Sequence, residues 1–199
     1  MKVILIILTI ILIAFLMVQF FAMRGQRNIE MYPYTVEKKY ETFEIRSYEA
    51  TLFTSVKLST KEYSSASSEG FSILAGYIFG KNERNEKISM TSPVTMSLED
   101  SVTMMFMVPK NLKKETLPLP DQKQIKFKQE PEKTLAAINF SGWANDKKIE
   151  KYKKKLISAL DSEGISHSNK FYFFGYNPPY EVFNRRNEIV VELSTSPID

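Results

Sequence analysis

The histidine and cysteine content limits the chemistry that this chain can perform. The sequence has one histidine, His167, and no cysteine. These counts exclude disulfide bonds, cysteine nucleophiles, thiolate zinc sites and histidine-cluster metal sites. A Ser–His–Asp triad would need His167 as its base, and no serine stands in a Gly-x-Ser-x-Gly motif. We therefore expect a binding protein rather than an enzyme, with an acid–base pair of carboxylates as the open catalytic alternative.

The charge distribution argues against a nucleic-acid partner. Of the 27 lysines and arginines, three (Lys2, Arg24 and Arg27) lie in or beside the apolar N-terminal segment. The remaining 24 nearly balance the 23 acidic residues. Nucleic-acid-binding domains usually carry a concentrated basic surplus, which this chain lacks. The sequence indicates no particular protein partner.

The N-terminal segment has the length and composition of a membrane anchor. Residues 3–23 contain no charged side chain, and as a helix they can cross a hydrocarbon core of about 30 Å. The segment is longer than a usual signal-peptide core, and no A-x-A-like cleavage site follows it. We expect residues 1–23 to anchor the chain in the lipid bilayer by a single pass through residues 3–23. A signal peptide that is removed is the alternative.

The membrane side of the domain depends on opposing charges. The short start with Lys2 is typical of an anchor that exports the domain behind it, whereas Arg24, Arg27, Lys38 and Lys39 favour a cytoplasmic location for the domain. The sequence leans slightly to a periplasmic or extracytoplasmic domain.

After a polar tether at residues 24–39, the hydrophobic pattern predicts strands, a helix and a hairpin. Strand patterns occupy residues 43–46 and 50–58, and the hairpin occupies residues 88–98 and 102–108, with a bulge or an edge at Pro93. Between them, Phe71, Leu74, Ala75 and Ile78 follow the spacing of one helix face. Ser59 fits the N-cap of a capping box, and Gly80 fits the C-terminal end.

The same order of elements then repeats. Strand patterns at residues 125–128 and 135–143 precede a helix pattern at 146–160, and strands follow at 171–176 and 188–193. We therefore predict an α+β domain over residues 40–199, in which duplicated β-α-β-β units form an antiparallel sheet or distorted β-barrel with two main helices. The transmembrane helix precedes this domain.

Three motifs resemble those of the SOUL heme-binding protein family, and the resemblance covers nearly the whole chain after the tether. The first motif is Glu44-Ile45-Arg46-Ser47-Tyr48. The second is Gly70-Phe71, Leu74 and Tyr77-Ile78-Phe79-Gly80-Lys81-Asn82, followed by Lys87-Ile88-Ser89-Met90-Thr91-Ser92-Pro93-Val94. The third is Gly175-Tyr176-Asn177-Pro178-Pro179, followed by Arg185-Arg186-Asn187-Glu188. The motifs occur in order and at matching spacing.

This resemblance implies the duplicated fold and a non-covalently bound cofactor, heme or a related tetrapyrrole. It places the ligand in an apolar groove beside the first domain helix. It also implies a non-enzymatic role in tetrapyrrole carriage, buffering or sensing.

A porphyrin site needs an apolar slot and cations near the propionates. The candidate cofactor-binding residues are Phe71, Leu74, Tyr77, Ile78, Lys81, Arg84, Lys87, Met90, Tyr176 and Arg186. Phe71, Leu74 and Ile78 also fit simple core packing, whereas Tyr77 lies off their stripe. Glu83 and Glu86 stand among the cations, so a solvated loop is the alternative for that segment.

The sequence does not single out one residue as the axial ligand of a heme iron. The position that holds a proposed axial histidine in one member of the family is Ser47 here, and a hydroxyl binds iron poorly. His167 is the candidate metal ligand, with an exposed histidine in a polar loop as the alternative. Methionine can also ligate heme iron, but core packing is the favoured interpretation for Met90 and its neighbours.

The absence of histidine at position 47 motivates a second functional hypothesis. A non-heme small-molecule or partner-binding module of the same topology would resemble the effector-binding domains of bacterial transcription regulators.

Overall fold

The computed structural model describes residues 2–25, 29–60, 62–99, 101–178 and 180–194, and its first half carries the predicted strand–helix–hairpin order. The N-terminal helix α1 spans Lys2–Gly25. It is followed by β1 (Glu30–Met31), β2 (Tyr34–Lys39), β3 (Glu44–Tyr48), β4 (Thr51–Lys57), α2 (Tyr63–Ile78), β5 (Thr91–Ser92), β6 (Val94–Ser97) and β7 (Thr103–Met107). The segment assigned to a tether therefore contains two strands, and β2 pairs with β3.

The second half repeats this order after a short 3₁₀ helix, η2 (Lys114–Thr116). Its elements are β8 (Lys126–Glu130), β9 (Lys133–Ser141), α3 (Asp146–Ser162), β10 (His167–Gly175) and β11 (Arg186–Leu193). The predicted strand at 171–176 begins earlier, at His167, because the chain enters β10 directly after the turn that follows α3. The α+β class and the two domain helices are confirmed.

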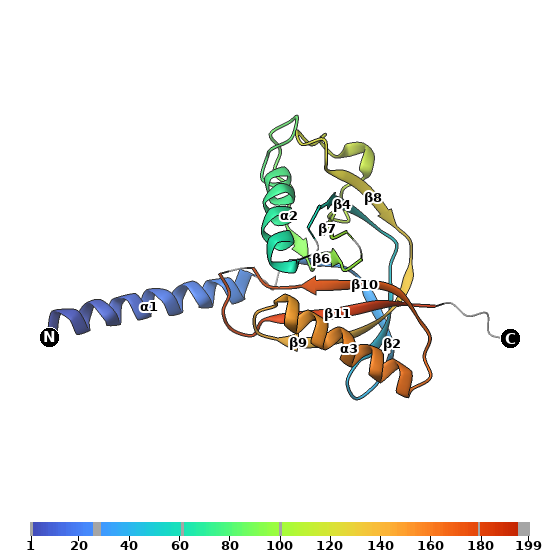
Figure 1. Cartoon of the computed structure of the whole chain (residues 1–199). Coiled ribbons are helices and arrows are strands. Elements are labelled where there is room, and N and C mark those ends of the chain that lie inside the picture. Colours follow the sequence, from blue (N-terminus) through green and yellow to red (C-terminus); the bar gives the residue numbers. More distant parts are fainter. Residues whose placement is uncertain (1, 26–28, 61, 100, 179, 195–199) are drawn as a thin grey trace.

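The sheet topology shows the duplication. In the described part of the chain, nine strands form one antiparallel sheet in the order β2-β3-β9-β11-β10-β6-β7-β4-β8. The triplets β4-β7-β6 and β9-β11-β10 are equivalent parts of the two halves, and they meet where β6 pairs with β10. The strand that precedes each triplet in the sequence pairs with the other half: β3 with β9, and β8 with β4. This exchange joins the halves into one curled sheet (Figure 1).

The sheet has two buried faces because side chains alternate along each strand. On β7, Met104 and Phe106 lie in the cluster beneath α2 and α3, whereas Met105 and Met107 lie in a second cluster on the opposite face. We call these the helix face and the inner face. The sheet curls around the inner face, since β8 at one end of the strand order leads directly into β9 near the other end.

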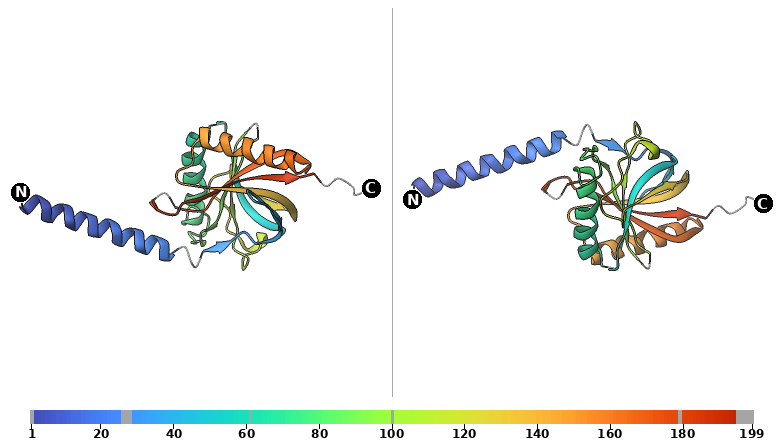
Figure 2. Two further views of the ribbon diagram at one scale, coloured as in Figure 1. Left: turned by 90° about the horizontal axis from the view of Figure 1, so that it is seen from below. Right: turned by 90° about the horizontal axis from the view of Figure 1, so that it is seen from above.

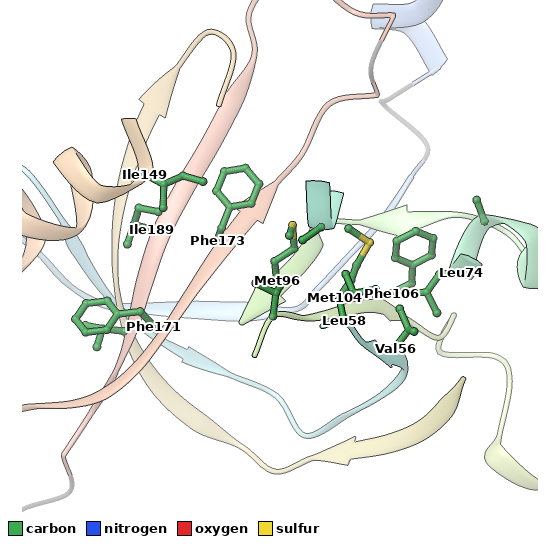
Figure 3. Close-up of a cluster of buried hydrophobic side chains, with 14 of the residues drawn as sticks. Val56, Leu58, Leu74, Met96, Met104, Phe106, Ile149, Phe171, Phe173 and Ile189 are labelled. Atoms are coloured by element: carbon green, nitrogen blue, oxygen red, sulfur yellow. The ribbon is translucent and has the colours of Figure 1, made fainter. Parts of the chain in front are cut away.

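The helix face is a core with one packing centre for each half. Figure 3 shows one group of side chains from β4, the residue after it, α2, β6 and β7, and a second group from α3, β10 and β11. The first group contains Val56, Leu58, Leu74, Met96, Met104 and Phe106, and the second contains Ile149, Phe171, Phe173 and Ile189.

The N-terminal end of α2 differs from the sequence prediction, whereas its C-terminal end agrees with it. Ser59 is not the N-cap; Glu62 occupies that position, and its side chain makes no capping hydrogen bond. Instead the amide of Tyr63 donates to Asp146 Oδ1 at 2.6 Å, so the first residue of α3 caps α2. At the other end, Gly80 follows the C-cap with a φ of +113°, a conformation that glycine adopts without steric cost.

The predicted interruption at Pro93 is confirmed. It separates β5, which pairs with β1, from β6, which pairs with β7 and β10. Proline has no amide hydrogen to donate, so one continuous ladder cannot pass through this position.

The helix α1 projects from the domain, and its N-terminal end lies far from the sheet (Figures 1 and 2). Lys2–Gln19 has a mean hydropathy of 2.7, and only 6% of this window is buried. By length and composition the segment can cross a membrane, although an N-terminal signal sequence has the same properties.

Candidate functional site

The apolar candidates on α2 lie mainly in the core. Leu74, Tyr77 and Ile78 are buried, and Phe71 is half-buried with its ring centroid 5.5 Å from that of Phe106. The Tyr77 hydroxyl donates to the carbonyl oxygen of Pro118 at 2.9 Å, and burial raises the pKa of Tyr77 to about 12. Tyr77 is therefore a core residue with a satisfied hydroxyl, although its sequence position lies off the inward stripe.

The cationic candidates surround the C-terminal end of α2. Lys81, Arg84 and Lys87 are exposed, and the aliphatic part of Lys81 lies beside Gly76. Arg84 donates to the carbonyl oxygen of Thr116 and lies 3.5 Å from Glu86. The segment after α2 is thus attached to η2 as well as to its own neighbours.

Two exposed apolar side chains lie among these cations. Phe79 is 62% exposed and Leu119 is 61% exposed. The backbone of Leu119 pairs with Glu83, and buried Asn82 holds the turn by donating to the carbonyl oxygens of Tyr77 and Glu86. We call the exposed side chains Phe79, Lys81, Arg84, Lys87 and Leu119 the α2-end surface.

The other candidates are dispersed. Met90 is half-buried against the helix-face core. His167 is the first residue of β10, opposite Leu193, and so does not lie in the predicted polar loop. Its ring packs against Phe171, and Nδ1 lies 2.8 Å from the carbonyl oxygen of Ser168. The structure does not bring His167 together with the α2-end surface.

Tyr176 and Arg186 meet at a residue that the sequence analysis did not select, Glu188. This carboxylate is fully buried on the inner face. It accepts hydrogen bonds from Arg46 at 2.8 and 3.1 Å, from Arg186 at 2.6 and 3.1 Å, and from the Tyr176 hydroxyl at 2.7 Å. We call these four residues the Glu188 network.

The network is electrostatically coupled. Burial alone raises the pKa of Glu188, but the hydrogen bonds and charge of Arg46 and the charge of Arg186 outweigh it and hold the pKa below its ordinary value. The same carboxylate raises the pKa of both guanidiniums against the effect of their burial. Burial and the charge of Glu188 raise the pKa of Tyr176, so its hydroxyl keeps its proton.

The first and third motifs contained a signal for this network. In each motif an arginine and a glutamate stand two residues apart, Glu44 with Arg46 and Arg186 with Glu188, and residues two apart share one face of a strand. The strands of the two motifs, β3 and β11, lie on either side of β9, so the two residue pairs can meet across β9. Ser47 alternates with Arg46 along β3 and is not part of the network; its hydroxyl donates to Glu132 at 3.4 Å.

A second feature of the inner face is a cleft of about 390 Å³, within the usual range of small-molecule pockets. Met105 and Tyr172 lie at its apolar side. The charged residues of its lining are Glu99, Lys128, Glu130, Glu132, Lys133, Lys170 and Glu192. An adjoining small hollow is lined by Tyr32 and Thr95, whose buried hydroxyls make no hydrogen bond to any described residue.

The described residues contain no group of three or more aspartate, glutamate or histidine side chains that could hold a metal ion.

Comparison with known proteins identifies a family. The family model described as SOUL heme-binding protein matches residues 29–192. Heme-binding protein 1 of Xenopus laevis is 30% identical over 161 residues, which are 77% of this chain and 84% of that protein. Heme-binding protein 2 of Homo sapiens is 30% identical over 165 residues, which are 78% of this chain and 80% of that protein.

Solved structures support the fold. The EcmrR C-terminal domain matches with a TM-score of 0.61 and 12% identity, over 82% of this chain and 99% of that chain. A hydrolase from Listeria innocua matches with a TM-score of 0.51 and 11% identity, over 79% of this chain and 94% of that chain. At such low identity the likeness concerns the fold alone.

Proposed function

The chain belongs to the SOUL heme-binding protein family, and from this membership we propose that it binds heme or a related tetrapyrrole without a covalent bond. The observation that carries the proposal is the extent of the family match, because residues 29–192 include nearly all of the sheet and both domain helices. Heme, when bound, supplies an iron with redox and ligand-binding chemistry. The role is carriage, buffering or sensing rather than catalysis.

We place the tetrapyrrole on the α2-end surface. Phe79 and Leu119 offer exposed apolar area, and Lys81, Arg84 and Lys87 offer cations for the propionates. Leu74, Tyr77 and Ile78 support this surface from within the core, and half-buried Phe71 flanks it along α2. His167 lies elsewhere in the fold, so we expect the macrocycle to bind without histidine ligation.

We further propose that α1 anchors this domain in a lipid bilayer. The apolar window Lys2–Gln19 is about 27 Å long at 1.5 Å per residue, close to the thickness of a hydrocarbon core. The slight lean to an extracytoplasmic domain is also part of this proposal; it comes from the short start with Lys2 and opposes the charges of Arg24 and Arg27.

Absorbance titration tests the ligand and its location. We expect the full chain in detergent micelles to bind hemin and metal-free protoporphyrin with one-to-one saturation, after subtraction of protein-free micelles. Replacing Lys81, Arg84 and Lys87 together by alanine should raise the Kd about tenfold, because three exposed charge contacts of about 0.5 kcal/mol each are lost. His167→Ala should leave the Kd unchanged.

A matched variant controls for net charge. Lys147, Lys151 and Lys154 are exposed on α3, which contacts the N-terminal end of α2, and their replacement by alanine removes the same charge away from the C-terminal end of α2. An equal loss of affinity in both triple variants would contradict the proposed location. Absence of saturable binding in the wild-type chain would contradict tetrapyrrole binding itself.

The inner-face cleft favours a second candidate function, the binding of a non-heme small molecule. Its volume and its mixed apolar and charged lining suit such a ligand. A thermal-shift screen of small organic molecules tests this candidate. A stabilising compound whose effect is lost in the Lys128→Ala, Lys170→Ala double variant would support it, and stabilisation by tetrapyrroles alone would argue against it.

A further inference from the structure

The loop between β10 and β11 packs against α1. The side chain of Gln19 donates to the carbonyl oxygen of Tyr180 at 2.9 Å and accepts from the amide of Val182 at 3.0 Å. One helical turn earlier, the ring of Phe15 lies 6.4 Å from that of Phe183. All views show this loop as the part of the domain that reaches furthest along α1 toward its N-terminal end (Figures 1 and 2).

The side chains that the loop exposes are apolar. Tyr180 is 59% exposed, Val182 42% and Phe183 48%. Glu181, the one acidic residue between Asn177 and Arg185, is only 2% exposed and so turns inward. Soluble surfaces rarely gather large apolar side chains while burying the neighbouring charge, because burial of a carboxylate costs free energy.

A tryptophan extends the same surface. Trp143 is 52% exposed, and the guanidinium of Arg185 lies 4.0 Å from the centre of its ring. Arg185 in turn donates to the carbonyl oxygens of Asn177, Pro178 and Glu181, which ties the loop to Trp143. Aromatic side chains of this kind are enriched at membrane–water interfaces. We call Trp143, Tyr180, Val182 and Phe183 the loop patch.

We propose that the loop patch inserts into the interface of the same bilayer that α1 crosses. The inference rests on the proposed anchoring by α1. The contact with Phe15 places Phe183 about 6 Å below the level of Gln19, where the apolar window ends, and about 12 Å below the level of Met23, the last uncharged residue before Arg24. This range overlaps the 5–10 Å to which interfacial apolar groups are buried. The hydrogen bonds to Gln19 satisfy two backbone groups of the loop where water is scarce.

Trp143 is the only tryptophan of the chain, so its fluorescence reports on the loop patch. The full chain without ligand is reconstituted in phosphatidylcholine vesicles, with bromine on the acyl chains either near the headgroups or near the bilayer centre. We expect the bromine near the headgroups to quench Trp143 at least twice as strongly as the bromine near the centre. The double variant Tyr180→Ser, Phe183→Ser should lose most of this quenching and become at least twofold more accessible to aqueous acrylamide.

Val36→Ser is the matched control, because Val36 is a comparably exposed apolar residue on β2, outside the loop patch. It should leave both quenching values unchanged.

One result would overturn the proposal and leave the anchor intact: the wild-type chain floats with the vesicles, but Trp143 is open to acrylamide and is not quenched by bromine. Shielding from both quenchers would also overturn it, because a second copy would then cover the patch. A chain that does not float with vesicles would overturn the anchor and the patch together, while the hemin titration reports separately on tetrapyrrole binding.

Discussion

At the scale of single residues, Glu188 is a carboxylate that is fully buried in the domain. Transfer of a carboxylate from water to the interior is costly, and the cost is offset only when charged partners and hydrogen bonds surround it. Arg46, Arg186 and Tyr176 supply five hydrogen bonds to it. Because these residues come from β3, β11 and the segment after β10, the network connects the N-terminal and C-terminal parts of the sheet.

Glu188→Gln should therefore destabilise the protein strongly. The substitution removes the charge that compensates buried Arg46, and loss of one partner of a buried ion pair costs about 3–5 kcal/mol. Urea unfolding of the full chain in detergent micelles, followed by circular dichroism, measures the free energy of unfolding. Glu192→Gln on the same strand is the control: this residue is partly exposed and contacts Lys170 at 3.5 Å, so we expect at most about 1 kcal/mol.

The Glu188 network also predicts a pH dependence. The folded state holds the pKa of Glu188 below its ordinary value of 4.5, so its stabilisation is fully present above that pH and is lost as the pH falls through the folded pKa. The difference in free energy of unfolding between the wild type and Glu188→Gln should therefore shrink between about pH 6 and pH 3. A difference that stays constant or grows under acid conditions would show that Arg46 and Arg186 do not lower this pKa.

The predictability of the candidate site differs from residue to residue. Tyr176 and Arg186 can be selected from the sequence and do come together, but around Glu188 rather than around α2. Their partner Arg46 is more than a hundred residues away in the chain, and only the pairing of β3 and β11 with β9 reveals the contact. The burial of Tyr77 escapes prediction because helix periodicity cannot show that the loop at Pro118 covers it.

At the scale of elements, local patterns locate the helices but not every end. The C-terminal end of α2 depends on one residue, Gly80, so it can be predicted from the sequence. The N-terminal end depends on Asp146, which lies on α3 and accepts from the amide of Tyr63. A capping pattern within the chain, such as the one at Ser59, competes with tertiary partners of this kind and can lose to them.

Two glycines of α2 make a matched test of its packing. A Cβ at Gly70 would lie 2.9 Å from Leu58 and 3.0 Å from Met104, whereas at Gly76 it would meet the flexible side chain of Lys81 at 3.1 Å. Overpacking costs about 1–3 kcal/mol, and alanine gains about 1 kcal/mol over glycine in a helix. Gly70→Ala should lower the free energy of unfolding by up to about 2 kcal/mol, and Gly76→Ala should raise it by up to about 1 kcal/mol.

Urea unfolding of both variants under identical conditions measures this difference. Equal stability of the two variants would mean that α2 can move away from β4 and β7 without cost. That result would contradict close packing of this helix against the sheet.

At the scale of the whole molecule, the duplication is predictable because each half repeats the same succession of period-2 and period-3.6 patterns. The exchange of β3 and β8 between the halves is not, since strand order depends on pairing between distant segments rather than on local periodicity. For the same reason the sequence pattern assigns β2 to a tether: its side chains are mostly exposed, and only its pairing with β3 makes it a strand.

The orientation of the domain on its anchor depends on Gln19, the one buried polar side chain described in α1. Its amide satisfies the carbonyl oxygen of Tyr180 and the amide hydrogen of Val182, so Gln19→Leu removes both hydrogen bonds while keeping the helix apolar. A net loss of about 1 kcal/mol should raise the hydrogen exchange rate of the Val182 amide about fivefold, measured by mass spectrometry of the full chain in micelles. Thr9→Val is the control, because the Thr9 hydroxyl donates to the carbonyl oxygen of Leu5 within the same helix. It should leave the exchange of Val182 unchanged. Equal rates in the wild type and Gln19→Leu would mean that the loop is held by the sheet alone and that α1 does not orient the domain.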